Sequence, residues 1–213
     1  MNRIIIFANG ELPNIEKVRS MLRDDDYVIC ADGGTRHASS LGLKPALVIG
    51  DMDSTDSTYL QKLQTKGVPV ELFPRDKNET DLELAITRAV ELGPKEILIV
   101  AALGGRLDQT IANISLLSDL RLSAFNVKLD DGVEETFFCR DQLQVHGRRG
   151  DIISLIPWGG TVSGIRTKSL KWILNNETLY PEKTRGISNE MTDDIADIKI
   201  SSGMLLVVHT RKS

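Results

Sequence analysis

The sequence has little cysteine and no long apolar run, and each shortage excludes a class of protein. Two cysteines among 213 residues are too few for a disulfide-stabilised scaffold. Cys30 and Cys139 lie in apolar segments without metal-type spacing, so we expect small buried hydrophobic residues. The apolar runs at 4–8 and 97–102 fall well short of the roughly 20 residues that a membrane helix needs. No signal peptide is expected after Met1 either, which predicts a cytoplasmic protein.

The chain also lacks a strong excess of either charge. It has 30 acidic and 26 basic residues and a formal net charge of -4, which argues against a protein that binds nucleic acid through a basic surface. With 41% hydrophobic and 26% charged residues, the composition is that of a globular protein with a substantial core. The length fits one large domain or two small ones.

The first 125 residues or so alternate short apolar runs with helical patterns, which predicts an α/β domain with a Rossmann-like parallel sheet flanked by helices. A capping box at Thr80 and Glu83 predicts the start of one helix, and Gly93-Pro94 predicts its end. The strands are expected to be covered on both faces because their apolar runs are continuous. The predicted strands are 4–8, 27–31, 47–49, 70–73 and 97–101.

After about residue 145, short runs that alternate apolar and polar residues predict a small antiparallel β-sandwich. Ala196, Ile198 and Ile200 alternate with polar residues, as in a strand with one face in the core. Residues 125–145 are expected to join the halves, with domains at 1–130 and 131–213. The predicted strands are 152–156, 161–165, 170–174, 187–191, 196–200 and 204–209.

Polar or glycine-rich segments directly follow all five strands of the α/β half. Because the carboxyl ends of parallel strands meet at one edge of the sheet, these segments are expected to converge there. The segments are Asn9-Gly10-Glu11, Asp32-Gly33-Gly34, Gly50-Asp51-Met52-Asp53-Ser54, the stretch 75–81, and Gly104-Gly105-Arg106-Leu107-Asp108-Gln109.

Three acids at this edge predict a magnesium site. Asp51 and Asp53 are two residues apart on a loop, so their carboxylates can face the same cation. Asp81 lies in the first turn of its helix, where it can supply a third oxygen or support the helix start electrostatically. Asp-x-Asp alone is common in solvated turns, and the convergence of the loops is what favours the metal.

Glycines and basic residues at the same edge predict contacts with phosphate. Gly33 and Gly34, and likewise Gly104 and Gly105, allow backbone N–H groups to approach phosphate oxygens, or they serve only as tight turns. Arg106 can neutralise a phosphate, while Asp108 suits a metal, a substrate hydroxyl or the positioning of Arg106. Further cations near this edge are Arg36, Arg75 and Lys77.

Together these groups indicate phosphoryl or pyrophosphoryl transfer, in which charge neutralisation carries most of the catalysis. The histidines, His37, His146 and His209, have no metal-type spacing and are expected to be hydrogen-bonded or solvated.

These segments of the chain resemble those of the bacterial thiamine pyrophosphokinase family. The resemblance runs through the strand-end segments above, through 76–83, and through Thr184-Arg185-Gly186-Ile187-Ser188-Asn189-Glu190 in the β half. It implies transfer of the pyrophosphoryl group of ATP to the hydroxyethyl group of thiamine, with thiamine diphosphate and AMP as products. It also implies a homodimer in which the β domain reaches the site of the partner subunit.

The resemblance implies roles for individual residues. Asp51, Asp53 and Asp81 resemble the Mg²⁺-binding acids, and Arg106 and Asp108 resemble groups near the transferred phosphates. Nucleotide contacts are implied for Asp32, Gly33, Gly34, Lys77, Gly104 and Gly105. Ser188 and Asn189 resemble the thiamine-contacting strand, and Trp172 is a further aromatic candidate or a core residue of the sandwich.

Two other functions remain open from the sequence. One is a diphosphokinase that acts on another primary alcohol, such as a hydroxymethyl pterin. The other is a non-catalytic sensor of nucleotide or thiamine, which the retention of Asp51, Asp53, Asp81 and Asp108 argues against because a sensor needs no complete metal site.

Overall fold

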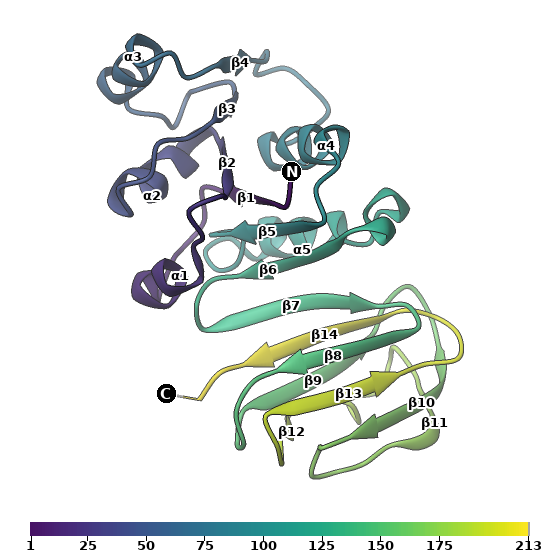
Figure 1. Cartoon of the computed structure of the whole chain (residues 1–213). Coiled ribbons are helices and arrows are strands. Elements are labelled where there is room, and N and C mark those ends of the chain that lie inside the picture. Colours follow the sequence, from purple (N-terminus) through teal and green to yellow (C-terminus); the bar gives the residue numbers. More distant parts are fainter. Residues whose placement is uncertain (213) are drawn as a thin grey trace. The chain divides into compact units, whose positions relative to one another are not determined.

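The structure is a computed structural model that describes residues 1–212. The chain divides into two compact units, Met1–Gly132 and Val133–Ser213. The first unit is an α/β structure around a parallel sheet, and the described strands of the second pair antiparallel (Figure 1). The prediction of an α/β half followed by an all-β half is therefore confirmed.

The α/β unit has six strands in the order β4-β3-β2-β1-β5-β6, and every paired neighbour is parallel. The chain adds β2, β3 and β4 on one side of β1 and then returns to place β5 and β6 on its other side. The strand order thus reverses between β1 and β5, and all carboxyl ends share one edge. The strands are β1 (Arg3–Phe7), β2 (Tyr27–Ala31), β3 (Leu47–Gly50), β4 (Val70–Leu72), β5 (Glu96–Val100) and β6 (Asn126–Asp130).

Helices cover both faces of this sheet, with α1, α2 and α3 on one side and α4 and α5 on the other (Figure 1). The Thr80 hydroxyl caps α4 by accepting a hydrogen bond from the Glu83 N–H at 3.2 Å, and Gly93 ends the helix at φ 62°, as predicted. The helices are α1 (Ile15–Met21), α2 (Thr35–Ser40), α3 (Ser57–Thr65), α4 (Asp81–Leu92) and α5 (Leu107–Leu116), with 3₁₀ turns η1 (Asp32–Gly34) and η2 (Leu120–Ala124).

The core of the α/β unit explains why its strands have continuous apolar sequences. Ile4, Ile5 and Ile6 on β1 are fully buried although consecutive side chains point to opposite faces. Both faces therefore need apolar residues, and the sheet is a rigid base for the loops at its edge.

The described strands of the β unit pair antiparallel in two sets, in the orders β12-β9-β14-β7 and β11-β10-β13-β8. Their inner faces share one hydrophobic core, in which Leu155 and Val207 of one sheet pack with Val145 and Ile198 of the other. The strands are β7 (Glu134–Cys139), β8 (Gln142–His146), β9 (Ile152–Pro157), β10 (Val162–Lys168), β11 (Asn175–Leu179), β12 (Asn189–Glu190), β13 (Ile195–Lys199) and β14 (Leu205–Thr210).

The two units meet at Gly132 and Val133, within the predicted join at 125–145, but strands in this stretch were not predicted. This stretch contains β6, β7 and most of β8. The strand β8 does alternate, since Val145 is buried and Gln144 and His146 are exposed. The sequence did not predict these strands because many of their residues are polar and face solvent or other polar groups.

The predicted strand at 170–174 is also wrong. Leu170 makes an isolated bridge to Met191, and the following residues bend away until β11 begins at Asn175. The real strand, Asn-Asn-Glu-Thr-Leu, has a single apolar residue and therefore lacked the expected signal. The strand expected at 187–191 shortens to Asn189–Glu190.

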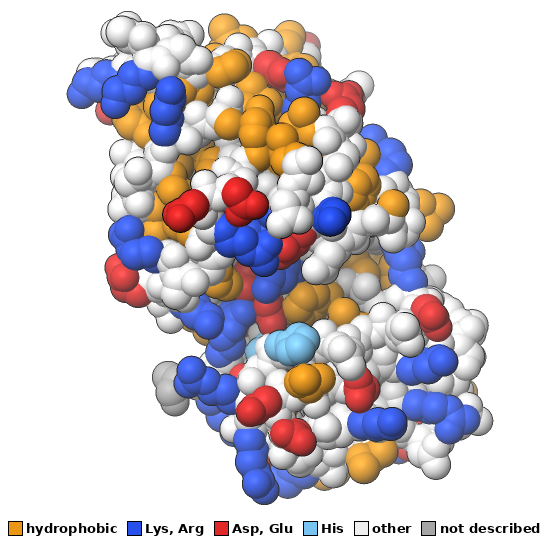
Figure 2. All heavy atoms as spheres, viewed as in Figure 1, with side chains coloured by type: hydrophobic (Ala, Val, Ile, Leu, Met, Phe, Trp, Pro, Cys, Tyr) orange, Lys and Arg blue, Asp and Glu red, His pale blue; other side chains and the backbone are white. Residues whose placement is uncertain are grey.

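Cys30 and Cys139 are free and fully buried, as expected. None of the helices within residues 1–212 has the length and apolar character that crossing a membrane requires. On the face drawn in Figure 2, acidic and basic side chains are interspersed, in keeping with the nearly balanced charge.

Candidate active site

Three acids from neighbouring strand ends lie together in the α/β unit. Asp32 follows β2, Asp51 and Asp53 follow β3, and each offers a carboxylate oxygen within 4.8 Å of the others. Because β2 and β3 are adjacent parallel strands, loops 20 residues apart in sequence meet at one edge. This confirms the convergence on which the predicted metal site depends.

A tight turn orients the two acids after β3. The Asp53 N–H donates to Asp51 Oδ1 at 3.1 Å, and the Ser54 hydroxyl donates to Asp53 Oδ1 at 2.9 Å. Met52, between the two acids, has a φ of 62°, which a side chain other than glycine rarely adopts. The strained residue lets both carboxylates remain on one side of the loop.

Asp32 belongs to the acidic group, although the family resemblance places it on the nucleotide side. Its side chain is 5% exposed, and its Oδ1 accepts hydrogen bonds from the Ser54 N–H at 3.3 Å and the Thr55 hydroxyl at 3.1 Å. These bonds connect Asp32 directly to the loop that carries Asp51 and Asp53. Asp32 also has a positive φ of 41°, another sparsely populated backbone conformation at this edge.

Asp81 begins α4 beside the same group and binds Lys77. The Lys77 ammonium lies 2.9 Å from Asp81 Oδ1 and 4.0 Å from Asp51 Oδ2. Burial raises the pKa of Asp81, Lys77 opposes the shift, and the negative charges of Asp51 and Asp32 add to it. Burial is thus the main cause of the raised pKa of Asp81, and the ammonium of Lys77, whose side chain is 11% exposed, offsets part of the negative charge at this edge.

Sequence reasoning missed Gly50, which lets the acids approach. A Cβ on Gly50 would lie 3.0 Å from Asp81 Cγ and 3.1 Å from Asp32 Cβ, and the residue has a φ of 147°. Any side chain would therefore push two acids apart. A glycine at the end of an otherwise apolar strand was the available signal.

Gly33 and Gly34 are explained by packing. A Cβ on Gly34 would collide with the Phe7 carbonyl, and one on Gly33 would collide with the Asn9 side chain. Arg36 holds this loop by donating to the carbonyl oxygens of Asn9 and Gly10 at 2.9 and 2.8 Å. Contact of these glycines with a nucleotide stays a prediction.

The loop after β5 has the backbone that its glycine pair predicts. Gly104 and Gly105 have φ values of 77° and 71°, in the left-handed region that favours glycine. They lead to Arg106, which precedes α5 and donates to Asp108 through Nε at 3.1 Å and a terminal nitrogen at 2.5 Å. Both side chains are exposed, so their charged ends are accessible to a ligand.

The hydrogen bond from Arg106 lowers the pKa of Asp108, and the backbone N–H of Gln109 lowers it further. Positioning of Arg106 is the alternative that the geometry supports.

In the β unit, Asn189 is bonded to the Trp172 backbone, and Ser188 directly precedes Asn189. Trp172 is 57% exposed, which excludes the alternative that it is a core residue. Asn189 is 7% exposed, and its carboxamide is bound to the Trp172 backbone at both ends. Ser188 is exposed and has a φ of 57°.

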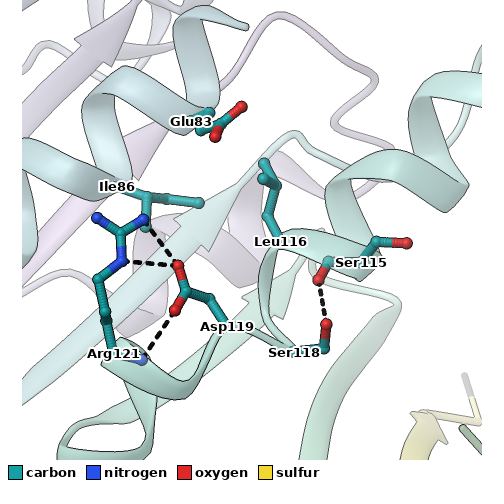
Figure 3. Close-up of a pocket in the computed structure, with 7 residues that line it drawn as sticks. All are labelled: Glu83, Ile86, Ser115, Leu116, Ser118, Asp119 and Arg121. Carbon is teal, nitrogen blue, oxygen red and sulfur yellow. Dashed lines mark hydrogen bonds and ion pairs between the residues drawn. The ribbon is translucent and has the colours of Figure 1, made fainter. Parts of the chain in front are cut away.

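A separate cavity of about 230 Å³ lies in the α/β unit and contains none of the predicted site residues. Glu83 and Ile86 of α4 line it together with Ser115 of α5 (Figure 3). At its rim, Arg121 Nε binds Asp119 at 2.8 Å.

Two family models match this chain in succession. The model described as "Thiamin pyrophosphokinase, catalytic domain" matches residues 18–129, which include all four acids of the site. The model described as "Thiamin pyrophosphokinase, vitamin B1 binding domain" matches residues 141–205. The chain belongs to the thiamin pyrophosphokinase family.

Known thiamine pyrophosphokinases align with nearly the whole of this family member. The curated thiamine pyrophosphokinase of Bacillus subtilis (strain 168) is 25% identical over 212 residues, which cover 99% of each chain. The crystal structure of thiamin pyrophosphokinase from Geobacillus thermodenitrificans has a TM-score of 0.86 at 25% identity, over 100% of this chain and 99% of that one. The Bacillus subtilis crystal structure, at 24% identity and a TM-score of 0.89 over all of both chains, shows the same fold. The family resemblance of the sequence is thus confirmed.

Proposed function

We propose that this thiamin pyrophosphokinase family member transfers the pyrophosphoryl group of ATP to the hydroxyethyl group of thiamine. The observation that carries the proposal is the acidic edge of the α/β unit, where Asp32, Asp51 and Asp53 converge beside Asp81. Family membership does not favour the hydroxymethyl pterin substrate or the non-catalytic sensor. Because ATP is the co-substrate, we also propose a cytoplasmic location.

The residues at this edge fit Mg²⁺. Mg²⁺ prefers oxygen ligands at about 2.1 Å, so two of its ligands lie at most about 4.2 Å apart. The oxygens of Asp32, Asp51 and Asp53 are within 4.8 Å, close to that geometry. We propose that Asp51, Asp53 and Asp81 hold the metal, as the resemblance implies, and that Asp32 supplies or orients a further oxygen.

When bound, Mg²⁺ would neutralise charge on the ATP phosphates. The thiamine hydroxyl oxygen forms a bond to the β-phosphorus of ATP, and the bond from that phosphorus to the oxygen bridging it to the α-phosphorus breaks. AMP leaves with the bridging oxygen, and the hydroxyl proton is released. Thiamine diphosphate and AMP therefore form in equal amounts.

The residues of the chain contribute position and charge to this step. Arg106, held by Asp108, is accessible to neutralise the transferred phosphates. Lys77 lies within reach of both Asp51 and Asp81 and can turn from them to a phosphate. We propose backbone contacts to the nucleotide from the loops that contain Gly33, Gly34, Gly104 and Gly105.

We also propose that the two units bind different substrates. The Rossmann-like sheet of domain 1–130 would bind ATP and Mg²⁺ at its carboxyl edge. Domain 131–213 would bind thiamine at the site formed by Ser188, Trp172 and the supporting Asn189, and would support a homodimer with sites at the subunit interface. Thiamine is an aromatic cation, for which an exposed indole is a suitable partner.

The test is a product analysis of the purified chain with ATP, thiamine and Mg²⁺. Chromatography should show AMP and thiamine diphosphate in equal amounts, and a chelator should abolish both. ADP with thiamine monophosphate would mean that the γ-phosphorus is attacked instead. No turnover of thiamine would reject the proposal.

A further inference from the structure

Asn189 has an unusual environment for a residue expected to contact a substrate. Its side chain is 7% exposed, and its Oδ1 accepts hydrogen bonds from the Trp172 N–H at 3.0 Å and from the Glu190 N–H at 2.9 Å. Its Nδ2 donates to the Trp172 carbonyl at 2.7 Å. The carboxamide thus binds both backbone polar groups of one residue 17 positions away.

The bonds to Trp172 require an amide. One end of the side chain must accept and the other must donate, and both roles are fulfilled only by an amide of this length. A carboxylate would place an oxygen against the Trp172 carbonyl, and alanine would remove the side-chain partner of the Trp172 N–H and carbonyl.

The segment that carries Trp172 depends on these bonds because it is neither helix nor strand. Leu170 and Leu174 are buried at its two ends, whereas Lys171, Trp172 and Ile173 are exposed. Beside Asn189, the Lys171 N–H donates to the Glu190 carbonyl at 2.9 Å. The short strand β12 therefore supports this exposed segment.

We infer that Asn189 is a positioning residue that fixes the Trp172 indole for thiamine, and that it acts through the Trp172 backbone without touching the vitamin. This inference rests on the proposed function and assigns Asn189 a different role from the vitamin contact that the family resemblance implies. Ser188, which is exposed, remains available for direct contact.

Tryptophan fluorescence can observe the positioning directly. The chain has two tryptophans, so Trp158→Phe leaves Trp172 as the only indole. Phenylalanine preserves the aromatic contact of residue 158 with Phe138, whose ring centroid is 5.5 Å away. In this background, Asn189→Asp should add a fast component to the anisotropy decay of Trp172, because the indole gains local motion. Unchanged anisotropy in a folded variant would overturn the inference.

Steady-state kinetics test whether positioning matters for thiamine. Asn189→Asp should raise the thiamine KM about tenfold, as expected for the loss of one or two hydrogen bonds, and leave the ATP KM within about twofold. Asn175→Asp is the matched control, since Asn175 is an exposed asparagine of the same unit. An unchanged thiamine KM would also overturn the inference.

A double-mutant cycle with Trp172→Ala separates positioning from direct contact. If Asn189 acts through the indole, Asn189→Asp should change the thiamine KM less than twofold once the indole is absent. An equal tenfold effect in both backgrounds would mean that Asn189 contacts thiamine itself.

Two further provisions cover a variant that does not fold and a parent protein that is inactive. If Asn189→Asp does not fold, as judged by circular dichroism, Asn189→Ala replaces it in all three measurements because it adds no charge. If the parent protein does not turn over thiamine, the proposed function fails, while the anisotropy still decides whether Asn189 holds Trp172.

Discussion

The molecule contains two groups of acids in opposite electrostatic states. In the α/β unit, four carboxylates share two nearby cations, with Lys77 beside Asp81 and Arg75 3.4 Å from Asp53. In the β unit, Glu135 and Asp151 flank the buried imidazole of His209 at 2.8 and 2.9 Å. The first group has more carboxylates than nearby cations at an accessible edge, and the second is buried and hydrogen-bonded to His209.

This difference separates a binding site from a structural network. Like charges held together cost free energy, and strained residues such as Asp32 and Met52 add to the cost, so such a group is typical of a site completed by a cation. Buried carboxylates whose oxygens are paired instead stabilise one arrangement of the strands that carry them. Each of the following predictions tests one side of this contrast.

The largest effect is expected for Asp51→Asn. Loss of a metal-binding carboxylate should reduce kcat at least about 10³-fold, since metal and electrostatic stabilisation supply several kcal/mol. The free energy of unfolding without Mg²⁺ should stay equal or rise by about 0.5 kcal/mol, because one repelling charge is removed. Kinetics and urea unfolding measure the two effects. Asp25→Asn, at an exposed position, is the control, and turnover within a few-fold of wild type would reject the metal assignment.

His209→Asn should have the next largest effect, on stability. It leaves two buried carboxylates without their shared partner, which should cost about 3 kcal/mol of unfolding free energy. His146→Asn, on the exposed face of β8, should change stability by less than about 0.5 kcal/mol. Urea denaturation of both variants gives the comparison, and equal midpoints would show that the buried network does not stabilise the β unit.

A smaller effect is expected on the way that the free energy of unfolding falls at acid pH. Burial favours a higher pKa for Asp151, but hydrogen bonds from the Lys212 and Arg148 N–H groups and from His209 outweigh it, so the pKa is lowered. A lowered pKa in the folded state stabilises the protein above the unfolded pKa of about 3.9, and this stability is lost as pH falls below that value. Asp151→Asn should therefore flatten the decline in stability between about pH 4 and 2. A variant that declines as steeply as wild type would contradict this.

The smallest effect concerns the thiols. Burial raises the pKa of Cys139 to about 11 and also raises the pKa of Cys30, so neither is a thiolate at neutral pH. A disulfide reagent such as dithionitrobenzoate should leave both unmodified in the folded protein and titrate two thiols in urea. Rapid labelling of the native chain would show that one of the cores opens.

The sequence predicted the α/β unit and its edge well because local patterns and one geometric rule were sufficient. Continuous apolar runs indicated buried parallel strands, and their common edge carries Asp51 and Asp53 close to Asp32, with Asp81 bound to Lys77 beside them. The roles of Asp32 and Gly50 were not predictable in this way. They depend on backbone angles and on hydrogen bonds between loops, which residue types alone do not specify.

The β unit was harder to predict, and its errors have a common cause. The strand β11 has the sequence Asn-Asn-Glu-Thr-Leu, so its place in the sheet comes from pairing with β10 and not from its own pattern. His209 has partners 74 and 58 residues away, and the bonds between Asn189 and Trp172 span 17 positions. Contacts of this kind become visible only in the folded chain.

The most direct test of the central claim is the effect of Mg²⁺ on thermal stability, measured without nucleotide or thiamine. A cation that binds only the folded state raises the melting temperature, and the rise grows with the logarithm of the cation concentration above its Kd. The account predicts that millimolar Mg²⁺ raises the Tm of the wild-type chain and of Asp25→Asn, and leaves that of Asp51→Asn unchanged. Equal shifts in all three proteins, or no shift in the wild type, would contradict the assignment of this acidic edge as a cation site.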